Sequence, residues 1–497
     1  MYKKLLAKTG NYSIAIVASR AAAFFLLPIY TRYLRPSDYG VLELLDLMAS
    51  ITGLLAGVYL GQALFYFYFS AHDETSKAKW VSAALIGAIM LGSVAGLGGI
   101  FFAVPLSKVM FGSPNYSRYV ILSLLTLGVS ITTEVGACFM RMLERASHYA
   151  KVSLAGLGLS IILNIFLIVG FHLRVVGIQI SALVSGIAVA VYMVAYIARH
   201  IRISLDFAYL IRIVRYSIPL AIGGLSVLAI NYGDRFFLRQ QITLGQLGIY
   251  SLGYKIGMLV AFFHAPFIMH WNAQVSALVR GPDAGRIFAR VTRYMAAGLI
   301  SVVVLLSFFA EPMLTVMTAP SFRGAYVLVP WVAFAYLLRS FGAHLQSVFI
   351  IEGRPDLEAK ANLLGAVTCV IGYVLLIPRF KAAGAVAATI AGFLVILIYS
   401  YYEAQRLRRF RLEISRITRM VLYGAGSILA FYAISPAGFI SQIVLASAGA
   451  IVYGFLLLYC GGFEPEERNS AKTLLLSFFG RRQQSASPVV ESACGTD

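Results

Sequence analysis

Apolar runs of about 20 residues, separated by short polar stretches, recur along this chain between residues 11 and 460. A helix rises 1.5 Å per residue, so each run can cross the roughly 30 Å of a bilayer's hydrocarbon core. Lipid offers no partner to a free backbone N–H or C=O, and this favours helices over open strands. The pattern predicts an all-α polytopic membrane protein with about fourteen transmembrane helices. The predicted spans are 11–31, 40–70, 81–105, 117–140, 150–171, 176–198, 216–238, 246–273, 291–310, 325–350, 361–378, 383–402, 417–434 and 438–460.

The composition supports a membrane protein and points away from metal or cofactor chemistry. Of 497 residues, 60% are hydrophobic and 12% are charged, and the mean hydropathy is +0.81. A water-soluble domain does not carry such a surplus of apolar surface. The cysteines, Cys138, Cys369, Cys460 and Cys494, have no zinc-ligand or disulfide spacing. We therefore expect no metal and no cofactor.

The positive charge is distributed over the loops. The chain has 41 Lys and Arg against 21 Asp and Glu, a formal net charge of +20. These cations are spread over many short loops instead of one stripe, which argues against a nucleic-acid partner. Most occur in one alternate set of loops, the set that includes both chain ends. By the positive-inside rule, both termini are predicted to be cytoplasmic.

Four short segments recur in the same order at a near-constant spacing, which indicates an internal duplication. The pairs are 12–14 with 216–218, 34–40 with 242–248, 149–156 with 358–365, and 175–177 with 382–384. Spans one to six and seven to twelve are thus two copies. Six is an even number, so both copies enter the membrane from the same side and the repeat is parallel.

The duplication divides the chain into predicted domains. Residues 1–205 form an N-terminal six-helix lobe, 206–405 a C-terminal six-helix lobe, 406–461 an extra helix pair and 462–497 a cytoplasmic tail. The basic, amphipathic stretch 199–215 joins the lobes. It is either a helix along the membrane surface or a solvated connector.

Three cations lie inside predicted spans, where a charge costs about 2.5–3.5 kcal/mol and needs a partner or a function. They are Arg20 in span one, Lys255 in span eight and Arg339 in span ten. Together they suit an anion, and the planar fork of arginine binds phosphate well. We predict that these cations form a substrate site for an anionic group such as a phosphate. The alternative is that each cation belongs to a structural ion pair.

Acidic and amide groups also mark two spans. Glu43 and Asp46 share a face of span two, and Asn231 and Asp234 share a face of span seven. With Tyr254, next to Lys255, we expect Glu43, Asp46 and Asn231 to line a cleft. Asp234 is a candidate for coupling to Na⁺ or H⁺. Simple partnering of nearby arginines is the alternative for these groups.

The 6 + 6 + 2 layout, the turn at 34–40 and the Asp234-Arg235 pair resemble the oligosaccharide flippases of the multidrug/oligosaccharidyl-lipid/polysaccharide (MOP) exporter superfamily. The resemblance implies two lobes around a cleft lined by spans one, two, seven and eight. Arg20, Lys255 and the acidic groups would face that cleft. Arg339, on span ten, departs from this scheme.

What the resemblance implies is a transporter of the bacterial inner membrane. It would flip an undecaprenyl-diphosphate-linked oligosaccharide, an O-antigen or exopolysaccharide repeat unit of polysaccharide or lipopolysaccharide biosynthesis, by alternating access. Other polysaccharide-assembly proteins are possible partners. A lipid II flippase and a drug/cation antiporter are alternatives within the superfamily. A glycan polymerase or glycosyltransferase is a distant alternative, because the chain has short external loops and no DxD, HExxH or nucleotide-binding glycine loop. We therefore predict that it is not an enzyme.

Overall fold

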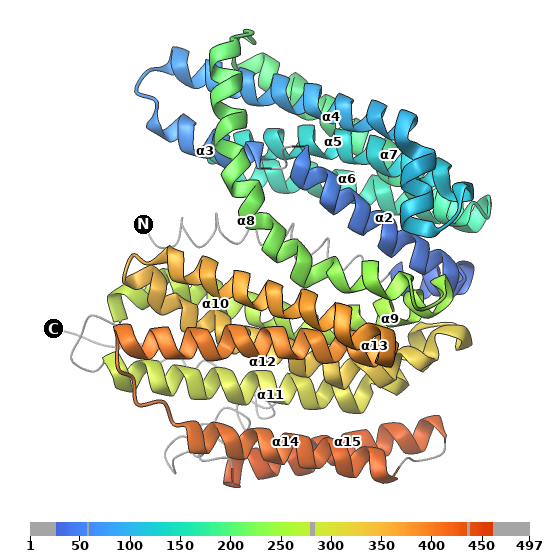
Figure 1. Ribbon diagram of the computed structural model, residues 1–497, viewed down its shortest axis with the longest axis vertical. Helices are drawn as coiled ribbons and strands as arrows, with labels where there is room; N and C mark the ends of the chain where they lie inside the picture. Colours follow the sequence, from blue (N-terminus) through green and yellow to red (C-terminus); the bar gives the residue numbers. More distant parts are fainter. Residues whose placement is uncertain (1–25, 57–58, 279–283, 435–437, 461–497) are drawn as a thin grey trace, which may run out of the picture. The chain divides into compact units, whose positions relative to one another are not determined.

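The computed structural model describes residues 26–56, 59–278, 284–434 and 438–460 (Figure 1). Within these ranges the regular structure is helical, with no strand. Eleven described helices are long and apolar enough to cross a membrane, or twelve if one bent pair is a single span. This confirms the all-α polytopic class. The count of fourteen stays a prediction, because much of the first predicted span lies outside the described residues.

The helices follow one another with short connections. In chain order they are α2 (Pro36–Leu55), α3 (Leu60–Ser70), α4 (Glu74–Phe111), η1 (Pro114–Tyr116), α5 (Ser117–Met142), α6 (Ala146–Ile165), η2 (Phe166–Gly170), α7 (Arg174–His200), α8 (Phe207–Arg239), α9 (Leu244–Gly257), α10 (Leu259–Leu278), α11 (Ala284–Met317), η3 (Pro320–Leu328), α12 (Val329–Ile351), α13 (Pro355–Leu407), α14 (Ile414–Ile434) and α15 (Phe439–Cys460).

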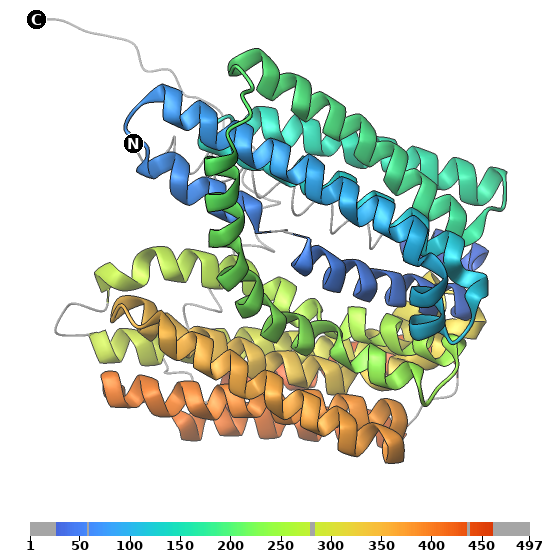
Figure 2. The ribbon, with the colours of Figure 1, turned by 45° about the horizontal axis from the view of Figure 1, so that its top comes forward.

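Helix α8 is bent, as its green ribbon shows in Figure 2. The segments Phe207–Ala221 and Gly223–Arg239 meet at 49°. Pro219 removes a backbone donor near this point, and Gly223 and Gly224 follow it, so the sequence weakens the helix here. The predicted basic connector 199–215 therefore divides into the end of α7, a short non-helical stretch and the first turns of α8.

Helix α13 contains two predicted spans, 361–378 and 383–402. Lys381 has φ 50° and ψ −124°, which is not helical. The hydroxyls of Tyr373 and Thr389, on either side of Lys381, lie 3.2 Å apart. The chain therefore reverses at Lys381, and the two arms pack against each other.

Helices α2 and α9 cross at two glycines that occupy equivalent places in the repeated segments 34–40 and 242–248. A Cβ on Gly40 would collide with the backbone carbonyl of Leu244, and a Cβ on Gly248 would collide with that of Pro36. Only glycine permits such close backbone approach. The two contacts are reciprocal, as expected when two copies of one motif meet about a two-fold axis.

The chain divides into two compact units. The first comprises Met1–Ser276 and Ala310–Arg409, and the second comprises Ala277–Phe309 and Phe410–Asp497. In the second unit, the buried guanidinium of Arg293 donates to Glu413 at 2.8 Å, and α14 lies beside α15. The lobes predicted at 1–205 and 206–405, the pair 406–461 and the tail 462–497 stay predictions.

Candidate functional site

A buried ionic cluster joins α2, α8 and α9 of the first unit. Arg235 of α8 donates from Nε to Oε2 of Glu43 on α2 at 3.1 Å. Its Nη1 donates to Oδ1 of Asp234 at 2.8 Å. Lys255 of α9 forms an ion pair with the other oxygen of Glu43. Two positive and two negative groups thus neutralise one another, as buried charges require.

Tyrosine side chains enclose the cluster. The Tyr250 hydroxyl donates to Oδ2 of Asp234, so both carboxylate oxygens of Asp234 are engaged. The Arg235 guanidinium lies 4.7 Å from the centroid of the Tyr254 ring and 5.4 Å from that of Tyr232. These are cation–π distances. The aromatic faces therefore stabilise the guanidinium where water cannot reach it.

Lys255 differs from the rest of the cluster in its exposure. Its side chain is 45% exposed, whereas those of Glu43 and Arg235 are 2% and 3% exposed. Its Nζ lies 5.1 Å from the centroid of the Tyr39 ring. Among the four charged groups, Lys255 is therefore the one that a ligand could contact.

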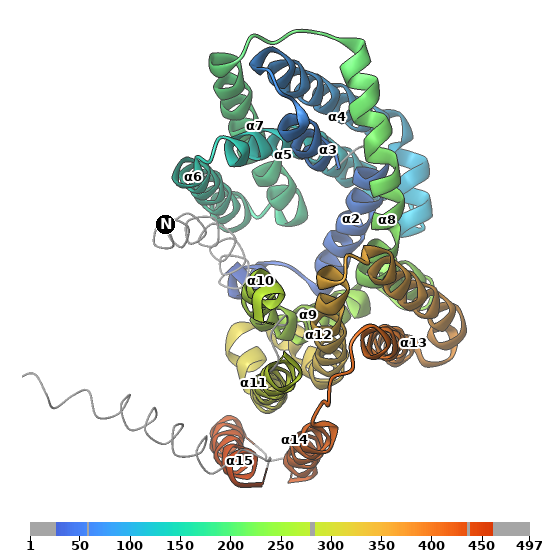
Figure 3. The ribbon, with the colours of Figure 1, turned by 90° about the vertical axis from the view of Figure 1, so that its left-hand side faces the viewer.

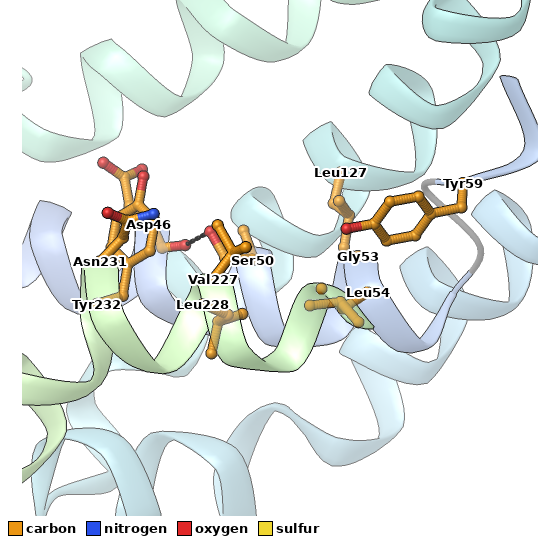
Figure 4. A pocket seen from close by; sticks show the side chains of 12 residues that line it. Asp46, Ser50, Gly53, Leu54, Tyr59, Leu127, Val227, Leu228, Asn231 and Tyr232 are labelled. Atoms are coloured by element: carbon orange, nitrogen blue, oxygen red, sulfur yellow. Dashed lines mark hydrogen bonds between the residues drawn. The ribbon is translucent and has the colours of Figure 1, made fainter. Parts of the chain in front are cut away.

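A cavity of about 460 Å³ lies next to the cluster. Helix α2 contributes Asp46 and Ser50, and α8 contributes Asn231 and Tyr232. Tyr59 lies at the opposite end of the cavity from this polar group (Figure 4). The cavity thus combines a carboxylate, an amide and two phenol rings. Hydrogen-bonding groups beside aromatic faces suit a polyol such as a sugar.

The Asp46 carboxylate is the unusual member of this lining. In the part of the chain that the structure describes, it makes no ion pair or hydrogen bond. The Ser50 hydroxyl donates to the backbone oxygen of Asp46 at 2.7 Å and leaves the carboxylate free. At the other end of the cavity, the Tyr59 hydroxyl occupies the space that a side chain on Gly224 would fill.

The structure brings together five of the predicted site residues, with Arg235 at their centre. Arg235 forms ion pairs with Glu43 and Asp234 and lies over the ring of Tyr254. Lys255 forms an ion pair with Glu43. The backbone oxygen of Asn231 accepts a hydrogen bond from Arg235 at 3.0 Å. Asp46 lies in the adjoining cavity.

The structure does not place the other two predicted cations in this assembly. Arg20 lies outside the described residues. Arg339 is on α12, and its Nη1 is buried without a hydrogen-bond partner among the described residues. The predicted trio of Arg20, Lys255 and Arg339 therefore stays a prediction.

The sequence did not indicate the central position of Arg235 or the contact of Tyr250 with Asp234. In the sequence, Arg235 is marked only by its position next to Asp234. Tyr250 and Tyr254 are four residues apart, so they share a helix face, but this spacing is only a weak signal of an aromatic site. Within the described ranges, no three His, Cys, Asp or Glu side chains are placed to hold a metal ion.

Residues 5–271, more than half of the chain, match the family described as polysaccharide biosynthesis protein. The chain belongs to this family. One curated relative is an uncharacterized membrane protein of Methanocaldococcus jannaschii, 21% identical over 161 residues. That match spans 31% of this chain and 31% of the relative's length.

Solved structures of MOP transporters share the fold of this polysaccharide biosynthesis family member. The lipid II flippase MurJ, in an inward closed conformation, gives a TM-score of 0.71 at 11% identity, over 90% of this chain and 98% of MurJ. An inward-facing multidrug resistance MATE transporter gives a TM-score of 0.65 at 15% identity, over 79% of this chain and 96% of that transporter. A MOP transporter from Pyrococcus furiosus gives a TM-score of 0.58 at 15% identity, over 81% of this chain and 96% of that transporter. At such low sequence identities, these TM-scores show a common fold. Together with the family match, they confirm the superfamily that the sequence resembles.

Proposed function

We propose that this protein flips a lipid-linked oligosaccharide across a bacterial inner membrane, from the cytoplasmic to the periplasmic leaflet. The observation that carries the proposal is the cavity in which Asp46, unpaired among the described residues, lies near Asn231 and Tyr232, with Tyr59 at the opposite end. Carboxylate and amide groups hydrogen-bond sugar hydroxyls, and tyrosine rings cover apolar sugar faces. The family match to polysaccharide biosynthesis proteins supports this substrate class.

The diphosphate of an undecaprenyl-linked substrate needs a cation next to the sugar site. Lys255 meets this need, because it is half exposed and shares Glu43 with Arg235. If a diphosphate binds Lys255, Glu43 keeps its hydrogen bond to Arg235, so the Glu43 carboxylate still has a cationic partner. Arg20 and Arg339 are further proposed contacts for the diphosphate.

Coupling to Na⁺ or H⁺ through Asp234 is less well supported by the contacts. One oxygen of Asp234 accepts from Arg235 and the other accepts from Tyr250. An ion would have to displace one of these partners. This arrangement favours a structural Asp234–Arg235 pair, with alternating access driven by the substrate and the membrane potential.

Two other substrates fit parts of the same site. Lipid II has the same diphosphate and sugar chemistry, and the fold resembles that of the lipid II flippase MurJ. A drug/cation antiporter would use the free Asp46 carboxylate to bind an organic cation. In both cases we propose the same topology, with both termini in the cytoplasm and other polysaccharide-assembly proteins as possible partners.

Transport by the purified protein in proteoliposomes distinguishes these substrates. An undecaprenyl-diphosphate oligosaccharide with a fluorescent sugar is placed in both leaflets, and a membrane-impermeant enzyme that cleaves the sugar reports its exposure. We expect full cleavage with the protein and about half without it. Lipid II, labelled in the same way, and an organic cation serve as competing substrates. Exchange of lipid II or the cation, with none of the oligosaccharide, would contradict the proposal.

A further inference from the structure

A second hollow, an open groove of about 510 Å³, lies where α3 meets the first segment of α8. Both helices belong to the first unit, and they are neighbours in Figure 3. The groove is lined by Phe67, Arg212, Arg215, Tyr216, Pro219 and Leu220. Arg212 and Arg215 are three residues apart, so they lie on one face of α8. Two guanidinium groups thus border the same groove.

The aromatic wall of this groove is held by stacked rings. Tyr216 stacks on Tyr66 with centroids 4.8 Å apart. Phe67 stacks on Trp80 at 4.2 Å, and Trp80 contacts Tyr209 at 4.3 Å. Neighbouring rings restrict one another's rotation, so the wall is formed before a ligand arrives.

The two arginines differ from the lysines nearby. Lys77 is paired with Glu74 at 2.8 Å, and Lys79 with Asp206 at 3.3 Å. In the described ranges, neither Arg212 nor Arg215 has a carboxylate within ion-pair distance. The groove therefore carries positive charge without a protein counter-charge, which makes it complementary to an anion.

The lining indicates what kind of anion fits. Besides the two guanidiniums, the only side-chain hydrogen-bonding group among the lining residues is the Tyr216 hydroxyl. The Asp46 cavity, in contrast, has carboxylate, amide and hydroxyl groups. Large apolar side chains elsewhere on the same two helices are exposed, among them Phe69 of α3 at 62% and Ile211 of α8 at 62%. A phosphate attached to hydrocarbon chains matches this surface better than a sugar does.

We propose that the groove is a binding site for an anionic phospholipid of the surrounding bilayer. Arg212 and Arg215 bind its phosphate, and its acyl chains lie along Phe67, Tyr216 and Leu220. Arginine suits phosphate through its planar fork, and basic pockets between membrane helices bind anionic head groups. The bound lipid connects α3 to the first segment of α8. The inference does not depend on what the transporter carries.

Trp80 offers a local reporter because it stacks on the groove residue Phe67. The purified full-length protein, in a neutral detergent, is titrated with phosphatidylglycerol or phosphatidylcholine carrying brominated acyl chains, which quench nearby tryptophan fluorescence. We expect phosphatidylglycerol to quench at the lower mole fraction. This preferential quenching should be lost in the Trp80→Phe variant, which assigns it to the groove.

Charge removal provides the decisive comparison. Cations at a membrane surface attract anionic lipid. Arg212→Gln/Arg215→Gln should therefore raise the mole fraction of phosphatidylglycerol at half-maximal quenching about tenfold or more, and a tenfold change corresponds to about 1.4 kcal/mol. Arg199→Gln/Arg202→Gln removes the same charge from the same basic stretch, outside the groove. This control should change the half-quenching mole fraction less than about twofold, because distant exposed charges are screened. Arg212→Lys/Arg215→Lys should retain most of the preference for phosphatidylglycerol.

Three results would overturn the site. The first is equal quenching of the native chain by the two brominated lipids. The second is an equal effect of the Arg199 and Arg202 substitutions. The third is displacement of brominated phosphatidylglycerol by a small fraction of polyprenyl diphosphate, which would assign the groove to the lipid-linked substrate instead. Size-exclusion chromatography of each variant separates these results from misfolding.

Discussion

The buried cluster and the adjoining cavity both use polar residues of α2 and α8, yet their charges have different environments. Glu43 and Asp46 are three residues apart on α2, as are Asn231 and Asp234 on α8. Glu43 is 2% exposed and binds two cations, whereas Asp46 has no side-chain partner among the described residues. The cluster therefore connects three helices, while the cavity leaves a carboxylate available to a ligand. Substitutions should separate these roles, with the cluster affecting stability and the cavity affecting transport.

The largest loss of stability is expected for Arg235→Met. This change removes the central cation and leaves the Asp234 carboxylate with two neutral donors, the Tyr250 hydroxyl and the backbone N–H of residue 235. Removing one partner of a buried ion pair costs about 3–5 kcal/mol. Thermal unfolding in detergent should show the loss. Arg354→Met breaks an exposed pair with Asp356 and serves as the control, with little change expected. A fully stable Arg235→Met would mean that the cluster does not connect the helices.

A smaller loss is expected for Gly248→Ala at the crossing of α2 and α9. The new methyl group would collide with the carbonyl of Pro36, and overpacking of this kind costs about 1–3 kcal/mol. Gly245→Ala is a matched control on the same helix, because its Cβ would meet atoms no nearer than 3.9 Å. Equal melting temperatures of the two variants would show that the crossing is not tightly packed.

Lys255→Met should destabilise the protein less than either change. Glu43 keeps its hydrogen bond to Arg235, and the half-exposed Lys255 pair contributes at most about 1 kcal/mol after screening. Its effect on transport should be larger than its effect on stability if Lys255 also binds the diphosphate. Lys255→Arg, which keeps the charge, should restore both. Normal flipping of the oligosaccharide by Lys255→Met in proteoliposomes would remove Lys255 from the proposed site.

The smallest effect on stability, within about 0.5 kcal/mol, is expected for Asp46→Asn. Hydrogen bonds of a charged group contribute about 1.5–3 kcal/mol, so transport of the oligosaccharide should fall about tenfold or more. Glu43→Gln is the comparison on the same helix and should lower the melting temperature instead. If Asp46→Asn flips the substrate at the native rate, the cavity is not the sugar site.

The helices could be predicted from the sequence because lipid requires apolar runs of a fixed length. Interruptions within the runs were harder to predict. The bend of α8 near Pro219 and Gly223 has a local signal, yet the predicted span 216–238 runs through it without a break. The reversal at Lys381 falls in the short gap between two predicted spans, where a change of chain direction was implied.

The sequence by itself determined the membrane class, the repeat and the residue types of the candidate site. These follow from local composition and from similarity between segments, neither of which needs coordinates. Only the tertiary structure decided which charges are partnered. Glu43 on α2 is far along the chain from Arg235 on α8 and Lys255 on α9. The spacing that places Glu43 and Asp46 on one helix face is the same for a buried ion pair and for a free carboxylate. The physical reason is that the environment of a charge depends on the helices packed against it, which the sequence around that residue does not specify.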